Sequence, residues 1–269
     1  MTHVIITGGS SGIGLALAHI YAARGARISL LARSLPALEA VQAELARDHR
    51  EASIHVESAD VSNEDQAFAA IRRCEDAFGP CAILITSAGI VEPGRFEALS
   101  SAAFNRQIQT NLLGSVHAVR AVYAAMKERR SGRIMLVSSG AGLIGIYGYT
   151  AYCASKFALH GFADALRSEA KPHGVNVSVC FPPDTETPQF SRELEHRPLE
   201  ATVIMGRVAP WSSATVALRI ARAIDKGQFE VFFGWTLWAL GRFGSAVKPV
   251  LNWWFDRGIR RIGGGGERP

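Results

Sequence analysis

The sequence has few cysteines, no run of basic residues and no long uninterrupted apolar stretch, and each lack removes a class of protein. Only four of the 269 residues are cysteines, with no CxxC pair and no His/Cys group at metal-ligand spacing, so we expect no metal site. The net charge of +5 is mild and no Lys/Arg run is interleaved with aromatic residues, so we expect no nucleic-acid partner.

Membrane-spanning and secretion signals are also missing. No stretch of about 18 or more uninterrupted apolar residues occurs, so we expect no transmembrane helix. A strand-like run, HVIIT, starts at His3 and leaves no room for the charged and apolar regions of a signal peptide. We therefore expect a cytoplasmic protein whose cysteines are reduced thiols in the core.

The residues that are present predict one α/β domain. Hydrophobic residues make up 48% of the chain and charged residues 20%, which suffices for a substantial core. Short apolar runs without strict alternation are typical of strands that are buried on both faces, and here they alternate with longer helical patterns. The sequence therefore predicts a doubly wound parallel (Rossmann) sheet within residues 1–233. The expected strands are 3–7, 27–32, 53–58, 82–86, 133–138, 176–181 and 229–233, and the expected helices are 12–24, 36–48, 63–77, 101–129, 151–171 and 212–226.

A glycine cluster follows the first expected strand. Gly8, Gly12 and Gly14 form a GxxxGxG pattern immediately before a helix, a spacing variant of the dinucleotide fingerprint. Glycines there permit a tight turn and close approach of backbone N–H groups to a pyrophosphate at the helix N-terminus. We expect a dinucleotide site here, which also includes Ser10, Ser11 and Ile13, and a plain glycine turn is the alternative.

The end of the second expected strand indicates which dinucleotide is bound. NAD-specific sites usually place a carboxylate there, on the ribose 2′-hydroxyl. Here Ala32 occupies that place and Arg33 follows, and a guanidinium can pair with a 2′-phosphate. The sequence thus favours NADPH, although Arg33 could also be a solvated surface residue. Asp60 and Val61, after the third strand, are expected to meet the adenine ring.

A tyrosine and a lysine lie one turn apart on an expected helix. Tyr152 and Lys156 share a helix face, and an ammonium near a phenol lowers the phenol's pKa from its usual value of about 10. Tyr152 could then protonate a developing alkoxide. Ser139 ends a preceding strand, where it could hydrogen-bond a substrate carbonyl. Asn111 lies inside an apolar helix and could hold a water that links Lys156 to solvent.

Together these motifs resemble the short-chain dehydrogenase/reductase superfamily over roughly residues 3–230. The resemblance rests on TGGSSGIG, Asp60-Val61, the SAG that contains Ala88 and Gly89, Asn111, Ser139 and YCASK. It implies that Ser139, Tyr152, Lys156 and Asn111 form a catalytic tetrad, that Lys156 also binds the nicotinamide ribose, and that Ala88 and Gly89 lie at the cofactor. The chain departs from the family at TSAG, where many members have NNAG.

The loop FPPDTETPQF at 181–190 narrows the resemblance. Pro182 and Thr187 match the superfamily's pattern, whereas Pro183 replaces a glycine and stiffens the backbone. Thr185 and Thr187 are expected to meet the carboxamide and pyrophosphate of the cofactor. The whole string resembles the loop of 3-ketodihydrosphingosine reductases, which implies NADPH-dependent reduction of the C3 ketone of a long-chain amino ketone.

The acids of this loop have two possible uses. That substrate carries a protonated amine beside the ketone, with which Asp184 or Glu186 could pair. Asp184 could instead cap a following helix. The sequence leaves the two uses open.

Residues 234–262 break the alternating pattern. The segment holds four of the five tryptophans together with several arginines, a composition that favours helices lying on a membrane surface. A surface between subunits of a dimer or tetramer, or a lid over the substrate, are the alternatives. The remaining residues, 263–269, are expected to be a disordered tail.

The sequence thus predicts reduction of 3-oxosphinganine to sphinganine by NADPH, in a homo-oligomer that can associate with the cytosolic face of a membrane. The substrate could instead be another hydrophobic carbonyl compound, such as a steroid, a retinoid or a 3-oxoacyl thioester. A protein of another class, a non-catalytic NADPH-binding sensor, would have no need of Tyr152.

Overall fold

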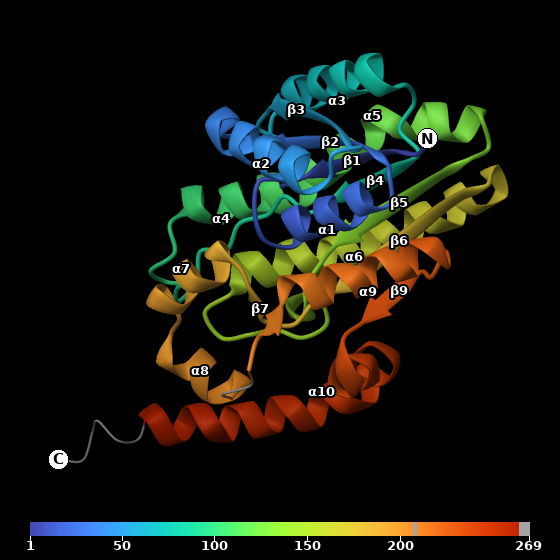
Figure 1. The fold of residues 1–269 in the computed structure, drawn as a ribbon. Helices are drawn as coiled ribbons and strands as arrows, with labels where there is room; N and C mark the ends of the chain where they lie inside the picture. The colour runs from blue at the N-terminus through green and yellow to red at the C-terminus, as the bar shows by residue number, and fades with distance from the viewer. Residues whose placement is uncertain (207–208, 264–269) are drawn as a thin grey trace.

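The computed structural model describes residues 1–206 and 209–263 and has one central parallel sheet (Figure 1). Its seven strands lie in the order β3-β2-β1-β4-β5-β6-β9. Their bounds are β1 His3–Thr7, β2 Arg27–Ala32, β3 Ser53–Ser58, β4 Ile83–Thr86, β5 Gly132–Val137, β6 Val175–Phe181 and β9 Glu230–Phe232. The predicted doubly wound fold is confirmed, and every strand end lies within one residue of the expected one.

Helices cover both faces of this sheet and enclose two apolar cores. One face carries α1 (Gly12–Ala23), α2 (Leu35–Asp48) and α9 (Ser213–Asp225). The other carries α3 (Glu64–Phe78), α5 (Gly114–Glu128) and α6 (Thr150–Ala170). All four cysteines are free and buried. Because both sheet faces are covered, the strands are apolar on both sides, which is why they lack the alternation of a half-exposed strand.

Short polar side chains fix where several helices begin. Ser34 caps α2, Asn63 caps α3 and Ser212 caps α9, each accepting a hydrogen bond from a backbone N–H of the first turn. Helix α4 (Ser101–Ile108) begins in the same way at Ser100. It continues through a π-helical turn, Gln109–Leu113, into α5.

The strand order reverses between β1 and β4. These strands are neighbours, with Thr7 opposite Thr86, but the chain leaves β1 toward β2 and leaves β4 toward β5. Their carboxyl ends therefore diverge into a crevice, which is where ligands bind in open parallel sheets.

Several elements at this end of the sheet were not predicted. Two short helices, α7 (Pro188–His196) and α8 (Leu199–Met205), follow the loop after β6. A small parallel pair, β7 (Thr185–Glu186) and β8 (Trp211–Ser212), ties that loop to the start of α9. A 3-10 turn, Gly140–Gly142, follows β5 at this end, whereas a second one, Lys171–His173, lies at the opposite end, just before β6.

The C-terminal segment is helical. The element α10 (Gly234–Gly263) consists of two helices that meet at Phe243 and includes Pro249, and it lies at the lower end of the molecule in Figure 1. None of the described helices combines the length and hydropathy needed to cross a bilayer. Most of the expected tail, residues 264–269, lies outside the described residues.

Candidate active site

The glycine turn after β1 packs against two other segments. Gly8 has a φ of +71°, and a Cβ there would lie 2.7 Å from the backbone nitrogen of Ala88. Gly12 has a φ of +57°, and its Cβ would lie 2.9 Å from a methyl of Thr187. A Cβ on Gly14 would lie 2.2 Å from the carbonyl oxygen of Gly8. The turn therefore excludes side chains at all three positions, and its backbone approaches Ala88 and Thr187 closely.

The helix that follows this turn begins without a side-chain cap. Ser11 is the N-cap of α1 and makes no capping hydrogen bond. Ser10, Ser11 and Ile13 are each at least partly exposed. The first N–H groups of α1 thus have no side-chain acceptor, and the positive end of the helix dipole faces the crevice between β1 and β4.

The residues expected at the adenosine end follow the neighbouring strands β2 and β3. Arg33 is exposed at the end of β2 and forms no ion pair with any described residue. The Asp60 carboxylate accepts hydrogen bonds from the backbone and hydroxyl of Ser62. The side chain of Val61 is buried against Gly114, so it shapes the wall of the site rather than its surface.

Tyr152 and Lys156 lie on α6, near the carboxyl ends of β4 and β5. Lys156 is only 5% exposed, and its ammonium lies 5.6 Å from the centre of the Tyr152 ring. The ammonium donates one hydrogen bond, 3.0 Å long, to the carbonyl of Val137. A Cβ on Gly89 would lie 3.6 Å from Lys156 Nζ. The structure therefore brings Gly89, Tyr152 and Lys156 together.

Burial dominates the protonation of this pair. Desolvation raises the pKa of Tyr152, with the Ser139 hydroxyl acting in the opposite direction and Glu193 in the same one. Desolvation lowers the pKa of Lys156 to about 8. A fall in the Tyr152 pKa caused by the ammonium, as expected from the sequence, is not found in the protein alone, because removing phenolate from water costs more. Tyr152 is thus a protonated phenol and ready to donate.

Ser139 follows β5 and faces the same space. Its backbone is extended, and its side chain caps the turn Gly140–Gly142 by accepting from the nitrogen of Ala141 at 3.2 Å. That bond uses an acceptor site and leaves the hydroxyl proton available. The adjacent Gly140 donates to the carbonyl of Pro182, which is buried, so the loops after β5 and β6 are joined here.

Asn111 is fully buried in the π-helical turn, and its amide is occupied. The side-chain oxygen accepts from the nitrogen of Ile90 at 2.8 Å, and the amide nitrogen donates to the carbonyl of Ile90 and to Ser155. Its own carbonyl accepts from Ser115. The side chain thus fixes the loop after β4 to α6, and the expected water link to Lys156 remains a prediction.

The threonines after β6 have structural partners. The hydroxyl of Thr185 donates to the carbonyl of Pro183. Thr187 caps α7 by accepting from the nitrogen of Phe190, so the possibility that Asp184 caps this helix is wrong. Because Thr187 also touches Gly12, the loop after β6 meets the glycine turn, as the expected cofactor contacts require.

The structure has a charged network next to Tyr152 that the sequence did not predict. Arg197 donates to Asp184 at 3.0 Å and to Glu193 at 2.5 Å. The hydroxyl of Tyr149 donates to Glu193 at 2.7 Å, and burial and Glu193 raise its pKa. The Tyr149 ring meets the Tyr152 ring edge-on with centres 6.3 Å apart. Glu193 lies on α7, an unpredicted helix, so no motif placed it here.

The assembled residues fit a dinucleotide. The glycines let the turn after β1 pack directly against Ala88 and Thr187, and the start of α1 offers uncapped N–H groups. The buried ammonium of Lys156 uses one of its three donors on a described residue, which leaves donors for ribose hydroxyls. Both ends of the expected cofactor thus have suitable partners among the predicted residues.

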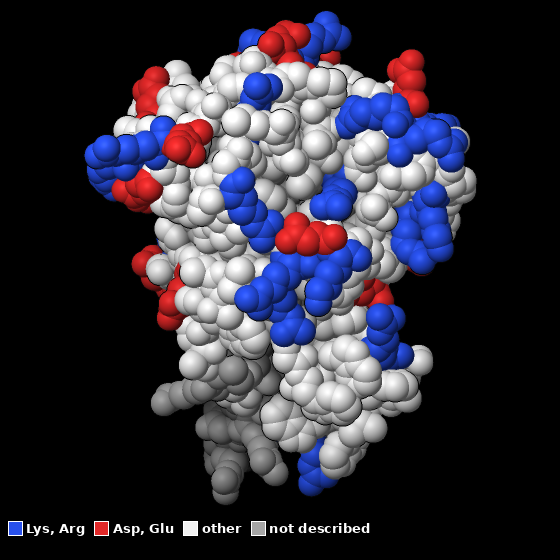
Figure 2. Space-filling view, turned by 45° about the vertical axis from the view of Figure 1, so that its right-hand side comes forward, with Lys and Arg blue, Asp and Glu red and all other residues white. Residues whose placement is uncertain are grey.

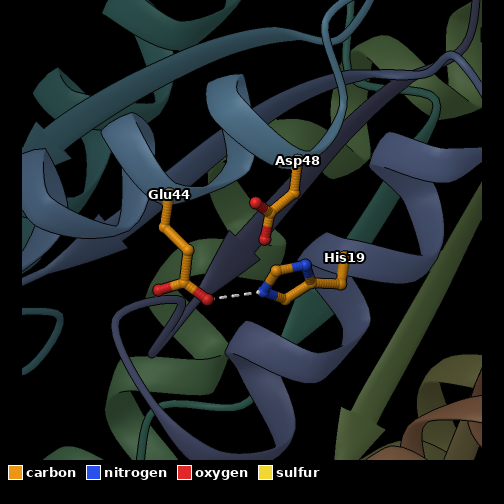
Figure 3. Close-up of side chains that lie close together, drawn as sticks. All are labelled: His19, Glu44 and Asp48. Carbon is orange, nitrogen blue, oxygen red and sulfur yellow. Dashed lines mark hydrogen bonds and ion pairs between the residues drawn. The ribbon is translucent and has the colours of Figure 1, made fainter.

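A second polar cluster lies away from this site (Figure 3). His19 on α1 pairs with Glu44 on α2 at 3.0 Å, and their potential ligand atoms and those of Asp48 lie within 4.8 Å of one another. Asp48 also pairs with Arg47, and all of these side chains are at least partly exposed. The cluster joins two surface helices, and we assign it no ligand.

Comparisons with known proteins agree with this geometry. A family model described as short chain dehydrogenase matches residues 2–198. The chain is 39% identical to a 3-ketodihydrosphingosine reductase of Bos taurus, over 93% of this chain and 76% of that protein. It is 38% identical to a 3-dehydrosphinganine reductase of Danio rerio, over 97% of this chain and 79% of that protein.

Solved structures show the same fold. A levodione reductase superposes with a TM-score of 0.80 at 26% identity, covering 86% of this chain and 95% of the other. ElxO with NADP bound superposes with a TM-score of 0.77 at 23% identity, covering 86% and 96%. The chain therefore belongs to the short-chain dehydrogenase family.

Proposed function

We propose that this protein is an NADPH-dependent reductase that converts the C3 ketone of 3-oxosphinganine to the alcohol of sphinganine. The observation that carries the proposal is the convergence of Tyr152, Lys156 and Ser139 beside the glycine turn. The substrate assignment is supported by relatives named 3-ketodihydrosphingosine reductase that match most of the chain.

Residues from both halves of the sheet would hold the cofactor. The backbone around Gly8, Gly12 and Gly14 would receive the pyrophosphate, and Arg33 the 2′-phosphate. Asp60 and Val61 would border the adenine, and Ala88, Gly89, Pro182, Thr185 and Thr187 would border the rest. When bound, NADPH supplies the hydride that reduces the ketone carbon.

Side chains of the protein supply the proton and stabilise the charge that its transfer leaves behind. Ser139 donates a hydrogen bond to the ketone oxygen and so polarises the carbonyl. Tyr152, held protonated by burial, gives its proton to that oxygen as the alkoxide develops. The Lys156 ammonium then stabilises the phenolate that remains. Asn111 acts indirectly, by fixing the Ile90 loop against α6.

A lipid substrate suits the surface beside the site. The exposed large apolar side chains include Leu194 on α7, Leu199 and Val203 on α8, and Trp253 on α10. Gly258 of α10 lies against Val203 of α8, so two of the helices that carry these side chains are in contact. We infer that the alkyl chain leaves the site along this region.

The test is direct. Purified protein is mixed with NADPH and 3-oxosphinganine, and NADPH absorbance and sphinganine are followed together. We expect stoichiometric loss of NADPH and gain of sphinganine. Consumption only with a steroid, a retinoid or a 3-oxoacyl thioester would replace the substrate assignment. NADPH binding without turnover of any carbonyl would instead identify a sensor.

We further propose that α10 docks on a membrane surface from which the lipid enters. The side chains of Trp235 and Trp253 are 74% and 58% exposed, and Trp side chains favour the interface between lipid and water. In the view of Figure 2, the described atoms at the lower end of the molecule, the level of α10, are mostly uncharged, with isolated basic side chains.

Paired substitutions test this docking better than removal of α10, because Leu237 of α10 approaches Gly140 beside Ser139. Trp253→Ser with Trp254→Ser should reduce flotation with phospholipid vesicles at least several-fold without loss of NADPH binding. Unchanged flotation would remove the membrane proposal. A change in oligomeric state instead would identify a subunit interface.

A further inference from the structure

The network beside Tyr152 carries more negative than positive charge. It contains two carboxylates, Asp184 and Glu193, and one guanidinium, Arg197, so its net charge is −1 when all three are ionised. The side chains of Arg197 and Glu193 are only 6% and 13% exposed. A net charge in such a shielded place acts strongly on a ligand that comes close to it.

The two carboxylates are not fully satisfied. Arg197 and Tyr149 both donate to Oε1 of Glu193, and Arg197 donates to Oδ2 of Asp184. Among the described residues, no group donates to Oε2 of Glu193 or to Oδ1 of Asp184. Neither of these oxygens is among the fully buried atoms that lack a partner. Each is therefore an acceptor within reach of a ligand.

The network is also held rigidly. Arg197 bridges the loop after β6 and helix α7, and it lies over the Phe190 ring at 5.4 Å. Its Nε donates to the hydroxyl of Tyr149, which precedes Tyr152 by one helical turn. The free acceptors thus stand at a fixed place relative to the proton donor.

We propose that Glu193, together with Asp184, recognises the protonated amine of the substrate and makes the enzyme specific for amino ketones. This inference rests on the proposed function. The amine of 3-oxosphinganine is on the carbon next to the ketone. When the ketone oxygen lies at Tyr152 and Ser139, the ammonium therefore lies beside the network of Asp184, Glu193 and Arg197. The ammonium supplies the positive charge and the donors that the network lacks.

The sequence left Asp184 and Glu186 as candidates for pairing with the amine, and the position of the network favours Asp184. Glu186 is exposed on β7, whereas Asp184 is paired with Arg197 in the network that also contains Glu193. Because Glu193 is the more deeply buried of the pair, we expect it to contribute more to specificity.

The experiment compares two substrates on matched variants. The substrates are 3-oxosphinganine and an analogue of equal length with hydrogen in place of the amine. Wild type should prefer the amino ketone in kcat/KM by about 10- to 100-fold, the usual size of a charged hydrogen bond. Glu193→Gln should reduce this preference to about threefold or less, mainly through KM. The control Glu195→Gln, an exposed acid on the same helix, should keep the preference.

The analogue also reports folding. A Glu193→Gln variant that reduces the analogue like wild type is folded, and if it does not fold, Asp184→Asn replaces it. Equal losses on both substrates would overturn the inference. If the wild-type enzyme reduced both substrates equally well, the inference about amine recognition would also be wrong. The protein would then still be a reductase of long-chain ketones. If the wild-type enzyme reduced neither substrate, the proposed function would be wrong as well.

Discussion

At the scale of single residues, desolvation sets the chemistry of the site. Tyr152 and Lys156 lie on one face of α6, and burial opposes the charged form of each. The phenol therefore stays protonated, which is the form that a reduction uses, and phenolate becomes favourable only as the proton leaves beside an ammonium. The pair is thus organised for donation rather than for resting ionisation.

The burial of Lys156 predicts a pH-dependent stability. Folding lowers its pKa from 10.5 to about 8, so the unfolded chain binds more protons between these values. The free-energy cost of the buried ammonium is therefore complete below about pH 8 and disappears as the pH rises toward 10.5. Lys156→Met should stabilise the protein at pH 7 by up to roughly 3 kcal/mol.

Urea unfolding of both proteins at pH 7 and pH 10 measures this difference. We expect the advantage of the methionine variant to shrink at pH 10. An advantage of the same size at both values of pH would show that the buried ammonium carries no such cost.

The position of Arg33 predicts that the protein prefers NADPH to NADH. Its guanidinium is exposed just after β2 and forms no ion pair in the described part of the chain. Arg33→Ala should raise the KM for NADPH by about 10- to 100-fold, as expected for loss of a charged contact, and leave the KM for NADH unchanged. A matched rise for both cofactors would mean that Arg33 does not read the 2′-phosphate.

Motifs predicted these residues because the chemistry depends on local spacing. Tyr152 and Lys156 are one turn apart, and the glycines follow one strand. Asn111 was predicted as a buried polar residue, but not its hydrogen bonds to Ile90, because these join residues 21 apart in sequence. Glu193 and Arg197 carry no motif, and only the tertiary fold brings them to Tyr149.

At the scale of elements, the π-helical turn between α4 and α5 determines how the loop after β4 is held. The turn carries Asn111, whose amide binds both backbone groups of Ile90 and reaches Ser155 on α6. One side chain thereby fixes the loop to the helix that carries the proton donor.

Removal of that amide should loosen all three elements. Asn111→Ala leaves the Ile90 backbone groups without a partner and should lower the free energy of unfolding by about 2–4 kcal/mol. Ser115→Ala, which loses a single bond to the Asn111 carbonyl, should cost about 1 kcal/mol. Urea titrations compare the two, and equal costs would contradict the role given to the amide.

The helices that the sequence did not predict are short. Helices α7 and α8 are nine and seven residues long, and α7 has no buried residue, so no face of α7 is packed into the core. Its position depends on Arg197 and on the cap at Thr187. Longer elements such as α6 were predicted because their apolar face is buried against the sheet.

At the scale of the whole molecule, the site depends on segments from most of the chain. The glycine turn follows β1, Lys156 lies on α6, and Thr187 touches Gly12 from beyond β6. A ligand that bridges these segments binds only the folded chain, so it must stabilise the whole fold.

Cofactor binding should therefore raise the melting temperature. NADPH at about 100 times its Kd should raise Tm by roughly 5–10 °C, as expected for a stabilisation of about 2.7 kcal/mol. NADH at the same concentration should raise it less, because Arg33 has no 2′-phosphate to bind. A thermal scan measures both, and equal shifts would contradict the assignment of NADPH.

The most direct test of the account is the kcat of Tyr152→Phe with NADPH and 3-oxosphinganine, measured beside the affinity of the variant for NADPH. The substitution keeps the ring and removes only the proton donor. We predict a fall in kcat of at least about 100-fold, the usual contribution of general acid catalysis, with NADPH affinity within about twofold of wild type. A variant that retained wild-type kcat would show that the proton comes from another group and would contradict the account.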